Sequence, residues 1–427
     1  MNYSDFFKMI PEASLVAILI VLFVADFVTA KTEERKWFNP LASVLLLLNT
    51  FVCLIPMDAQ TAFGGMYVTS SAVDVMKAIL SMGTFIVILQ SRVWAAKSGK
   101  EGEFYMLIVS TLLGMFAMMS AGNFLMFFLG LEMASVPLAC AVAFDMYRKN
   151  SAEAAAKFIL TATFSSGVML YGISFLYGQF GTLYFADIAT KMQATPLVIM
   201  GLVFFFSGLG FKISLVPFHF WTADTYQGAP TTVTGYLSVI SKGAAAFTLL
   251  SILFHVFDGM MEYWHVLLMI VVVLSITIAN LFAVRQSELK RFMAFSSISQ
   301  AGYIMLAAIG NNWANSVAAL SYYVLIYVVA NMAVFTIISV VEQNNGGKTN
   351  IDDYNGFYQT NPRLSFLMTL AMFSLGGIPP FAGMFSKFFI FMSGVNGADI
   401  NTTMGAWAYG VVFIALLNTV ISLYYYL

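Results

Sequence analysis

Charged side chains are scarce in this sequence. Of its 427 residues, 10% are Asp, Glu, Lys or Arg, whereas a soluble domain carries about 25%. Three histidines and two cysteines, Cys53 and Cys140, have no spacing typical of a metal site, an iron–sulfur site or a disulfide framework. No glycine-rich phosphate loop precedes a helix, and a net charge of −1 provides no basic surface for nucleic acid. The sequence therefore favours neither a soluble domain, nor a redox centre of its own, nor nucleic-acid binding.

Apolar residues make up 60% of the chain and form runs long enough to cross a bilayer. We predict an all-α bundle of thirteen transmembrane helices, near residues 10–30, 37–56, 74–92, 103–120, 122–144, 153–177, 196–217, 232–254, 264–284, 290–310, 314–342, 363–394 and 403–427. The last run reaches the final residue, Leu427, so we expect the chain to be cut short.

The distribution of Lys and Arg tests this helix count, because basic residues stay on the cytoplasmic side of a membrane. Thirteen of the 20 basic residues fall in loops after odd-numbered helices: Lys31, Arg35, Lys36, Arg92, Lys97, Lys100, Arg148, Lys149, Arg285, Lys290, Arg291, Lys348 and Arg363. Two, Lys8 and Lys191, fall in the N-terminus and the loops after even-numbered helices. The N-terminus is therefore predicted to face away from the cytoplasm.

The remaining five lysines, Lys77, Lys157, Lys212, Lys242 and Lys387, fall inside predicted helices. A lysine at a helix centre costs roughly 2.5–3.5 kcal/mol on insertion scales, so such residues are expected to face the bundle interior with partners or water. Lys77 is close to a helix end, and we expect its side chain to extend to the membrane surface. For Lys157, about one turn into its helix, the same behaviour and a role in transport both remain open.

The stretch GLGFKISLVPFHFWTADTYQGAPTTVTGYLSVISK, residues 208–242, organises the sequence. Pro217 interrupts a membrane helix, and a cation beside such a break is expected of an ion path. Lys212 and Lys242 flank the break, and His219 follows it either as a packing residue or as a proton relay. Glu132, in the middle of the fifth predicted helix, is either a proton site, the counter-charge of a buried lysine, or a carboxyl hydrogen-bonded for packing.

A second break is predicted at Gly376-Gly377-Ile378-Pro379-Pro380, just before Lys387. Because the two breaks lie five helices apart, we predict two inverted five-helix repeats with broken helices 7 and 12. The predicted units are residues 1–102 with helices 1–3, residues 103–254 with helices 4–8, and residues 255–427 with helices 9–13.

From about residue 103 onward the chain resembles the antiporter-like subunits of respiratory complex I. The matching motifs are GLE with its downstream proline, SAEAAAKFILTATFSSGVMLYGISFLYG, the stretch quoted above, LKRFMAFSSISQAGY and GGIPPFAGMFSKFFIF. The EAAAKF motif, the short length and the lysine at 387 are similar to the subunit N branch of that family, since subunit M is expected to carry an acid there. The family has fourteen helices, so one C-terminal helix is expected to be missing here.

The resemblance implies roles for individual residues. Glu132 matches a glutamate that pairs with a lysine in helix 7, here Lys212. Lys242 matches the central lysine of helix 8, and Lys387 matches the lysine that exchanges protons with the far side. Lys157 matches a lysine in helix 6 of subunit N.

The resemblance also implies a function. It is proton translocation by a membrane-arm subunit of a bacterial NADH–quinone oxidoreductase in the inner (plasma) membrane, with the lipid bilayer around it. No cofactor is expected in this chain; FMN, iron–sulfur clusters and quinone are expected in partner subunits. Subunits M, K, J and A are the expected membrane partners. A subunit of a multisubunit Na⁺/H⁺ antiporter and a subunit of a membrane-bound hydrogenase or ferredoxin-driven relative remain open as alternatives.

Overall fold

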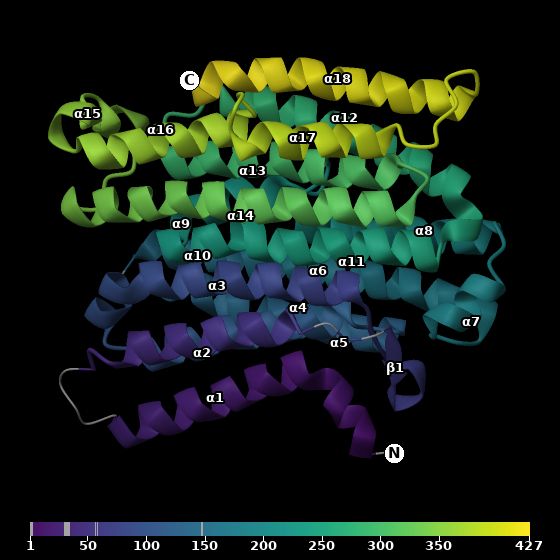
Figure 1. Ribbon diagram of the computed structural model, residues 1–427, viewed down its shortest axis with the longest axis horizontal. Helices are drawn as coiled ribbons and strands as arrows, with labels where there is room; N and C mark the ends of the chain where they lie inside the picture. Colours follow the sequence, from purple (N-terminus) through teal and green to yellow (C-terminus); the bar gives the residue numbers. More distant parts are fainter. Residues whose placement is uncertain (1–2, 30–34, 56, 58, 147) are drawn as a thin grey trace.

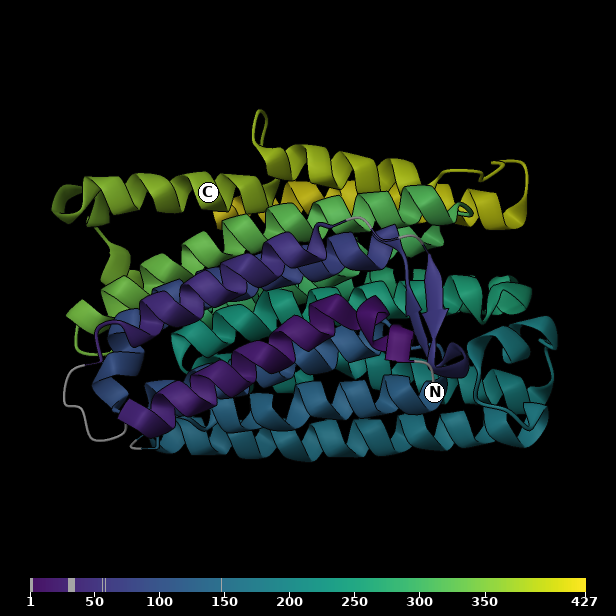
Figure 2. The same cartoon turned by 60° about the horizontal axis from the view of Figure 1, so that its bottom comes forward.

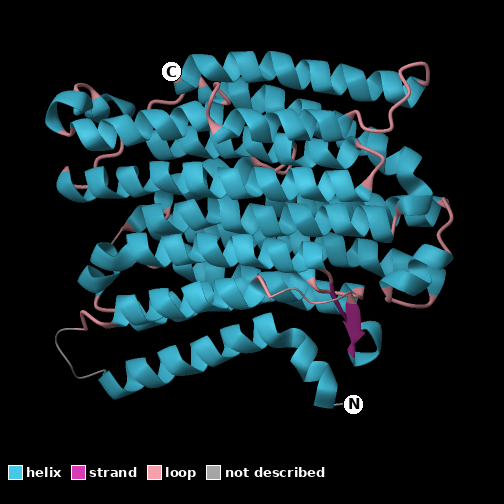
Figure 3. Cartoon of the chain, viewed as in Figure 1, coloured by secondary structure: helices cyan, strands magenta, loops and turns pink. Residues whose placement is uncertain are grey.

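The computed structural model describes residues 3–29, 35–55, 57, 59–146 and 148–427. It is a bundle of long helices lying roughly parallel or antiparallel to one another (Figure 1). Within the described residues, strands are confined to one antiparallel hairpin, β1 (Gln60–Ala62) and β2 (Tyr67–Thr69), drawn in magenta in Figure 3. The predicted all-α transmembrane fold is therefore confirmed.

Eleven helical segments among the described residues are long and apolar enough to cross a membrane. They comprise η1–α1 (Tyr3–Met9, Ile10–Thr29), α3 (Ser71–Ser98), α4 (Glu101–Met119), α5 (Phe124–Val142), α6 (Lys149–Phe180), α8 (Pro196–Ile213), α10–η3–α11 (Thr231–Tyr236, Leu237–Ser241, Lys242–His255), η4–α12 (Asp258–Met260, Met261–Ala283), α13–η5 (Leu289–Leu306, Ala307–Ile309), α14 (Trp313–Asn344) and α18 (Thr403–Tyr426).

Two further predicted spans correspond to helices that are individually shorter. They are α2 (Phe38–Cys53) and the divided pair α16 (Pro362–Gly376) and α17 (Ala382–Gly394). The remaining short elements connect these helices: η2 (Phe63–Gly65), α7 (Phe185–Thr190), α9 (Phe220–Gly228), η6 (Ile351–Tyr354) and α15 (Phe357–Thr360). Each of the thirteen predicted spans thus overlaps a helix, while the predicted pair of inverted repeats stays a prediction.

Both predicted helix breaks are present. The seventh span stops at Ile213, where Ser214 adopts φ +68°, and resumes as α9 after Pro217. The twelfth span stops at Gly376, and Gly377 adopts φ +83°, a left-handed conformation that glycine accepts without steric strain. The chain then passes the two prolines and re-enters a helix as α17. Each break frees backbone carbonyls inside the bundle, which only protein groups or water can satisfy.

The two ends of the bundle differ. The N-terminus, the β1–β2 hairpin and α7 lie at one end, which we call the hairpin end, and α15 lies at the opposite end (Figure 1). The start of α13 also lies at the opposite end, because the backbone N–H of Leu289 donates to the carbonyl of Thr349, just before η6. We call this the basic end, because Arg148, Lys290 and Arg291 gather there with the end of α14.

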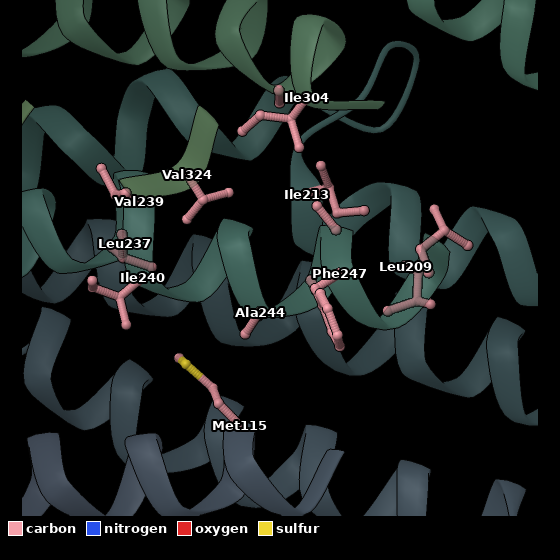
Figure 4. Packing of buried hydrophobic residues seen from close by; sticks show 14 of the residues in the cluster. Met115, Leu209, Ile213, Leu237, Val239, Ile240, Ala244, Phe247, Ile304 and Val324 are labelled. Atoms are coloured by element: carbon pink, nitrogen blue, oxygen red, sulfur yellow. The ribbon is translucent and has the colours of Figure 1, made fainter. Parts of the chain in front are cut away.

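The first three spans pack together along one side of the bundle, with α1 at its edge (Figures 1 and 2). Small residues allow the neighbouring helices α4 and α5 to approach closely. A Cβ added at Gly114 or Gly130 would lie within 2.5 Å of a backbone nitrogen of the other helix. In the middle of the bundle, apolar side chains of η3, α11, α8 and α4 belong to one buried cluster, among them Leu237, Leu209 and Met115 (Figure 4).

Candidate functional site: a row of buried lysines

Three lysines on three different helices are buried in the bundle, as predicted. Lys212 ends α8, Lys242 begins α11, and Lys387 lies in α17, and none is more than 5% exposed. Lys242 is near the midpoint of its 25-residue span from Thr231 to His255. Ammonium groups held this deep require polar partners or water to remain charged.

Lys212 binds a serine on the neighbouring helix. Its Nζ donates a hydrogen bond of 2.8 Å to the Oγ of Ser135, which is buried in the middle of α5. Glu132 precedes Ser135 by three residues, so both side chains lie on the same face of α5. The ion pairs among the described residues do not include Glu132 with Lys212, although the two charges are close enough to interact. Glu132 is half-buried, so its carboxylate borders the outer surface of this chain.

Lys242 binds a second serine. Its Nζ donates to the Oγ of Ser297 on α13 at 2.7 Å and lies 5.3 Å from the ring centroid of Tyr226 on α9. The hydroxyl of Ser297 is also 3.4 Å from the hydroxyl of Tyr226. The lysine therefore contacts both the short helix that follows the first break and the buried middle of helix α13. The π-helical segment η3 ends directly before Lys242. Such wide turns are frequent at functional sites.

Lys387 binds a backbone carbonyl at the second helix break. Its Nζ donates a 3.0 Å hydrogen bond to the backbone carbonyl of Gly376, the last residue of α16. The same ammonium lies 4.8 Å from the ring centroid of Tyr303 on α13. A carbonyl freed by the interrupted helix and an aromatic face thus stabilise the positive charge.

Helix α13 connects the last two lysines. Its polar residues Ser296, Ser297, Gln300 and Tyr303 recur at helical spacing, and all four are buried. Gln300 donates to the carbonyl of Leu375 at 3.2 Å, and its amide oxygen accepts from Tyr323. These residues lie within the motif LKRFMAFSSISQAGY, whose polar side chains were not predicted to take part in the site. Their signal was a polar row in an apolar helix.

A small cavity of about 10 Å³ adjoins Lys387, which is about the space that one water centre occupies. Its lining includes Gln300, Tyr327 and Ser386. The hydroxyl of Tyr327 is buried and has no hydrogen-bond partner among the described residues. Buried hydroxyls of this kind usually bind protein or water.

Lys157 lies apart from this row, at the surface of the basic end. Its side chain is 46% exposed and forms ion pairs of 2.8 Å with Glu153 and with Asp224. Arg291 completes the network through a 2.7 Å ion pair with Asp224. The hydrogen bond from Lys157, followed by that from Arg291, lowers the pKa of the Asp224 carboxyl below its ordinary value. These groups border a surface pocket of about 190 Å³.

His219 begins α9, the short helix that also carries Asp224. It is buried at the N-cap of α9, and its Nδ1 has no partner among the described residues. Its ring packs on Phe220 with centroids 4.5 Å apart. Both predicted roles of this histidine, as a packing residue and as a proton relay, are compatible with this position.

Two expectations about lysines were wrong. Lys77 does not extend to the membrane surface: it is 0% exposed, and its Nζ lies 2.7 Å from the Oε1 of Glu12. Lys290, expected in a loop, is buried in the first turn of α13, where it donates to the carbonyl of Ala229 at 3.1 Å. In both cases a neighbouring segment covers a helix end that the sequence suggested would be open to water.

Three comparisons identify the family. The model of the family "NADH:quinone oxidoreductase/Mrp antiporter, TM" matches residues 121–414. NADH-quinone oxidoreductase subunit N of Phocaeicola vulgatus is 56% identical over 430 residues, covering 100% of this chain and 89% of that protein.

Solved structures give the same fold. A chain of respiratory complex I from Thermus thermophilus with bound aureothin superposes with a TM-score of 0.79 at 30% identity, covering 97% of this chain and 88% of that one. A chain of the Mrp complex from Dietzia reaches a TM-score of 0.77 at 20% identity, covering 97% of this chain and 79% of that one, and shares the fold alone.

The clusters of His, Cys, Asp and Glu within the described ranges include no group of three that could hold a metal ion. The matched family region contains Lys212, Lys242 and Lys387 and both helix breaks. The chain therefore belongs to the transmembrane family shared by NADH:quinone oxidoreductases and Mrp antiporters, and within it to the subunit N branch that its motifs predicted.

Proposed function

We propose that this chain is a proton-translocating membrane subunit of a bacterial NADH–quinone oxidoreductase. The observation that carries the proposal is the connection of buried lysines through α13, with Lys242 on Ser297 and Lys387 beside Tyr303. A row of titratable ammonium groups with hydroxyl and amide groups between them can accept and release protons in sequence. A purely structural role does not explain three buried lysines, because each costs roughly 2.5–3.5 kcal/mol to place at a helix centre in the membrane.

In the proposed sequence, a proton passes along the row while each lysine alternates between its ammonium and amine forms. Loss of a proton from Lys212 leaves a neutral amine that Ser135 can still hydrogen-bond, because a hydroxyl both donates and accepts. A change in a neighbouring subunit would move the Glu132 carboxylate relative to Lys212 and so alter the stability of the ammonium form. Lys242 would then pass a proton towards Lys387.

The surface network at the basic end would supply protons to this row. The partly exposed side chain of Lys157 pairs with Asp224 of α9. His219, at the N-cap of α9, is buried. A histidine is suited to relay protons because its unperturbed pKa is near neutral. This arrangement supports cytoplasmic entry, in agreement with the excess of basic residues at that end, and would place the N-terminus on the opposite side.

Electron transfer belongs to partner subunits in this proposal. FMN, iron–sulfur clusters and quinone would reside there, and the antiporter-like subunit M with the small subunits K, J and A would be the membrane neighbours. Many apolar side chains of α1, α16, α17 and α18 are exposed in the described structure, which suits contact with lipid or with such neighbours. Mass spectrometry of the subunits that co-purify with the chain tests this assignment.

The central test is Lys212→Ala in the assembled complex, with Lys191→Ala on the exposed end of α7 as a matched control. We expect Lys212→Ala to abolish or sharply lower proton pumping coupled to quinone reduction, because the first cation of the row is lost. The control should pump normally. The measurement is acidification of inverted membrane vesicles at a known rate of NADH oxidation. Normal pumping by Lys212→Ala would refute the proposal.

A further inference from the structure

A second buried charge cluster lies outside the lysine row, at the hairpin end between α1, α3 and β2. The Nζ of Lys77 lies 2.7 Å from the Oε1 of Glu12 and donates to the hydroxyl of Tyr67 at 3.2 Å. The Tyr67 hydroxyl donates to the Oε2 of Glu12 at 3.0 Å, and Ser120 donates to its Oε1 at 3.4 Å. The pair is therefore fully enclosed, and its carboxylate is satisfied on both oxygens.

A second carboxylate, that of Asp74, belongs to the same cluster but is only half satisfied. Asp74 lies one helical turn before Lys77 on α3 and is 3% exposed. Its Oδ1 accepts a 3.0 Å hydrogen bond from Thr69 of β2, whereas its Oδ2 is buried without a partner among the described residues. A buried anionic oxygen with no donor is costly, and much more so than a neutral hydroxyl.

The charge of the cluster is unbalanced. The groups that interact with Asp74 are Lys77 on its own helix and Glu12 on α1, and the thiol of Cys53 on α2 also faces these charges. With both carboxyls ionised, two negative charges face one ammonium. Binding one proton would make the cluster neutral, and the free Oδ2 of Asp74 is the atom where that proton would remove an unsatisfied charge.

A polar row leads from this cluster into the bundle. Asp74, Lys77, Ser81 and Thr84 recur at intervals of three and four residues, so they line one face of α3. All four are buried. Ser81 continues the row to α2 through a 2.7 Å hydrogen bond to the Oδ1 of Asn49. Packing alone requires neither an unsatisfied carboxylate nor charges at the end of this row.

We propose that Asp74, with the Glu12–Lys77 pair, forms a second proton-binding site of this chain, which exchanges its proton with the aqueous phase at the hairpin end. The site lies in the first three helices, before residue 121, where the matched family region begins. It does not depend on the route through Lys212, so the failure of one proposal leaves the other standing. Asp74 lies in the first turn of α3, beside β2, at the hairpin end of that helix.

Infrared difference spectroscopy of the complex in lipid nanodiscs, recorded between acidic and alkaline pH, tests the site. We expect the carbonyl stretching band of one protonated carboxyl to disappear from the pH difference spectrum in Asp74→Asn. Asp187→Asn is the matched control, because Asp187 also accepts a 3.0 Å hydrogen bond from a threonine five residues away but is exposed. That variant should keep the buried-carboxyl band.

A second variant covers the case in which Asp74→Asn fails to assemble. Thr69→Val retains the Asp74 carboxyl and removes the hydrogen bond to its Oδ1, so the same band should shift in frequency without losing intensity. An unchanged spectrum in Asp74→Asn, or in Thr69→Val, would overturn the proposal. Loss of the band in Asp187→Asn would overturn it as well.

Discussion

The buried pair of Glu12 and Lys77 allows the loss of stability on removing one charge to be estimated. At an effective dielectric constant of ~20, two unit charges separated by the 2.7 Å between Nζ and Oε1 attract by about 6 kcal/mol. Desolvation of both ions offsets much of this attraction, yet removing one partner strands the other charge in the interior and costs about 3–5 kcal/mol. We therefore expect Lys77→Met, which leaves two buried carboxylates without a cation, to destabilise the first three helices by about 3–5 kcal/mol. Glu12→Gln should cost less, because Asp74 still faces Lys77.

The double variant distinguishes a stranded charge from a lost contact. In Glu12→Gln combined with Lys77→Met neither charge remains, and the new amide oxygen can still accept from Tyr67. The double variant should therefore be more stable than Lys77→Met alone, which is a large departure from additivity.

The assay is unfolding of the complex in SDS-containing mixed micelles, read by pulse proteolysis within residues 1–102. A Lys77→Met variant that loses less than about 1 kcal/mol would refute the reasoning. So would a double variant whose loss equals the sum of the two single losses.

Three further predictions follow from other contacts. Gly130→Ala should destabilise the chain by about 1–3 kcal/mol because its Cβ would meet the backbone of α4, whereas Gly167→Ala, with open space around it, should have little effect in the same proteolysis assay. Because Lys157 lowers the pKa of Asp224, the stability that Asp224 contributes is present above the ordinary aspartate pKa of about 3.9 and is lost as pH falls through the lower folded-state value. The difference in thermal stability between wild type and Asp224→Asn should therefore vanish at strongly acid pH; a constant difference would contradict this. Ser297→Ala should slow proton pumping without impairing assembly, and unchanged pumping would remove α13 from the proposed route.

Much of the architecture followed from hydrophobic run length and from proline. Run length predicted every span that the structure contains, and Pro217 with the Gly376–Pro380 stretch marked both interruptions. The wide turn η3 before Lys242 was not predicted, since nothing in LSVIS distinguishes it from an ordinary helix. Hydrogen-bond slippage of this kind depends on neighbouring helices rather than on local sequence.

The burial of the three central lysines could be predicted because each lies well inside a long apolar run. The error at Lys77 has a physical cause: its helix begins at Ser71, and β2 folds over that end and places Tyr67 on the ammonium. The sequence indicates where the helix begins, but it does not indicate that β2 packs over this helix end. The match of Lys157 to its family position gave no information about exposure, and the role of this lysine stays a prediction.

The separation of Glu12 from Lys77 along the chain has a consequence for membrane insertion. Helix α3 carries Asp74 and Lys77, two residues that lipid rejects, while the matching carboxylate arrives 65 residues earlier on α1. We therefore expect α1 to stay beside the translocon until α3 emerges, so that Glu12 and Lys77 enter lipid as an ion pair. If α1 left the translocon before α3 was synthesised, Lys77 would have no Glu12 beside it. We expect α3 then to pass across the membrane more often instead of inserting into it.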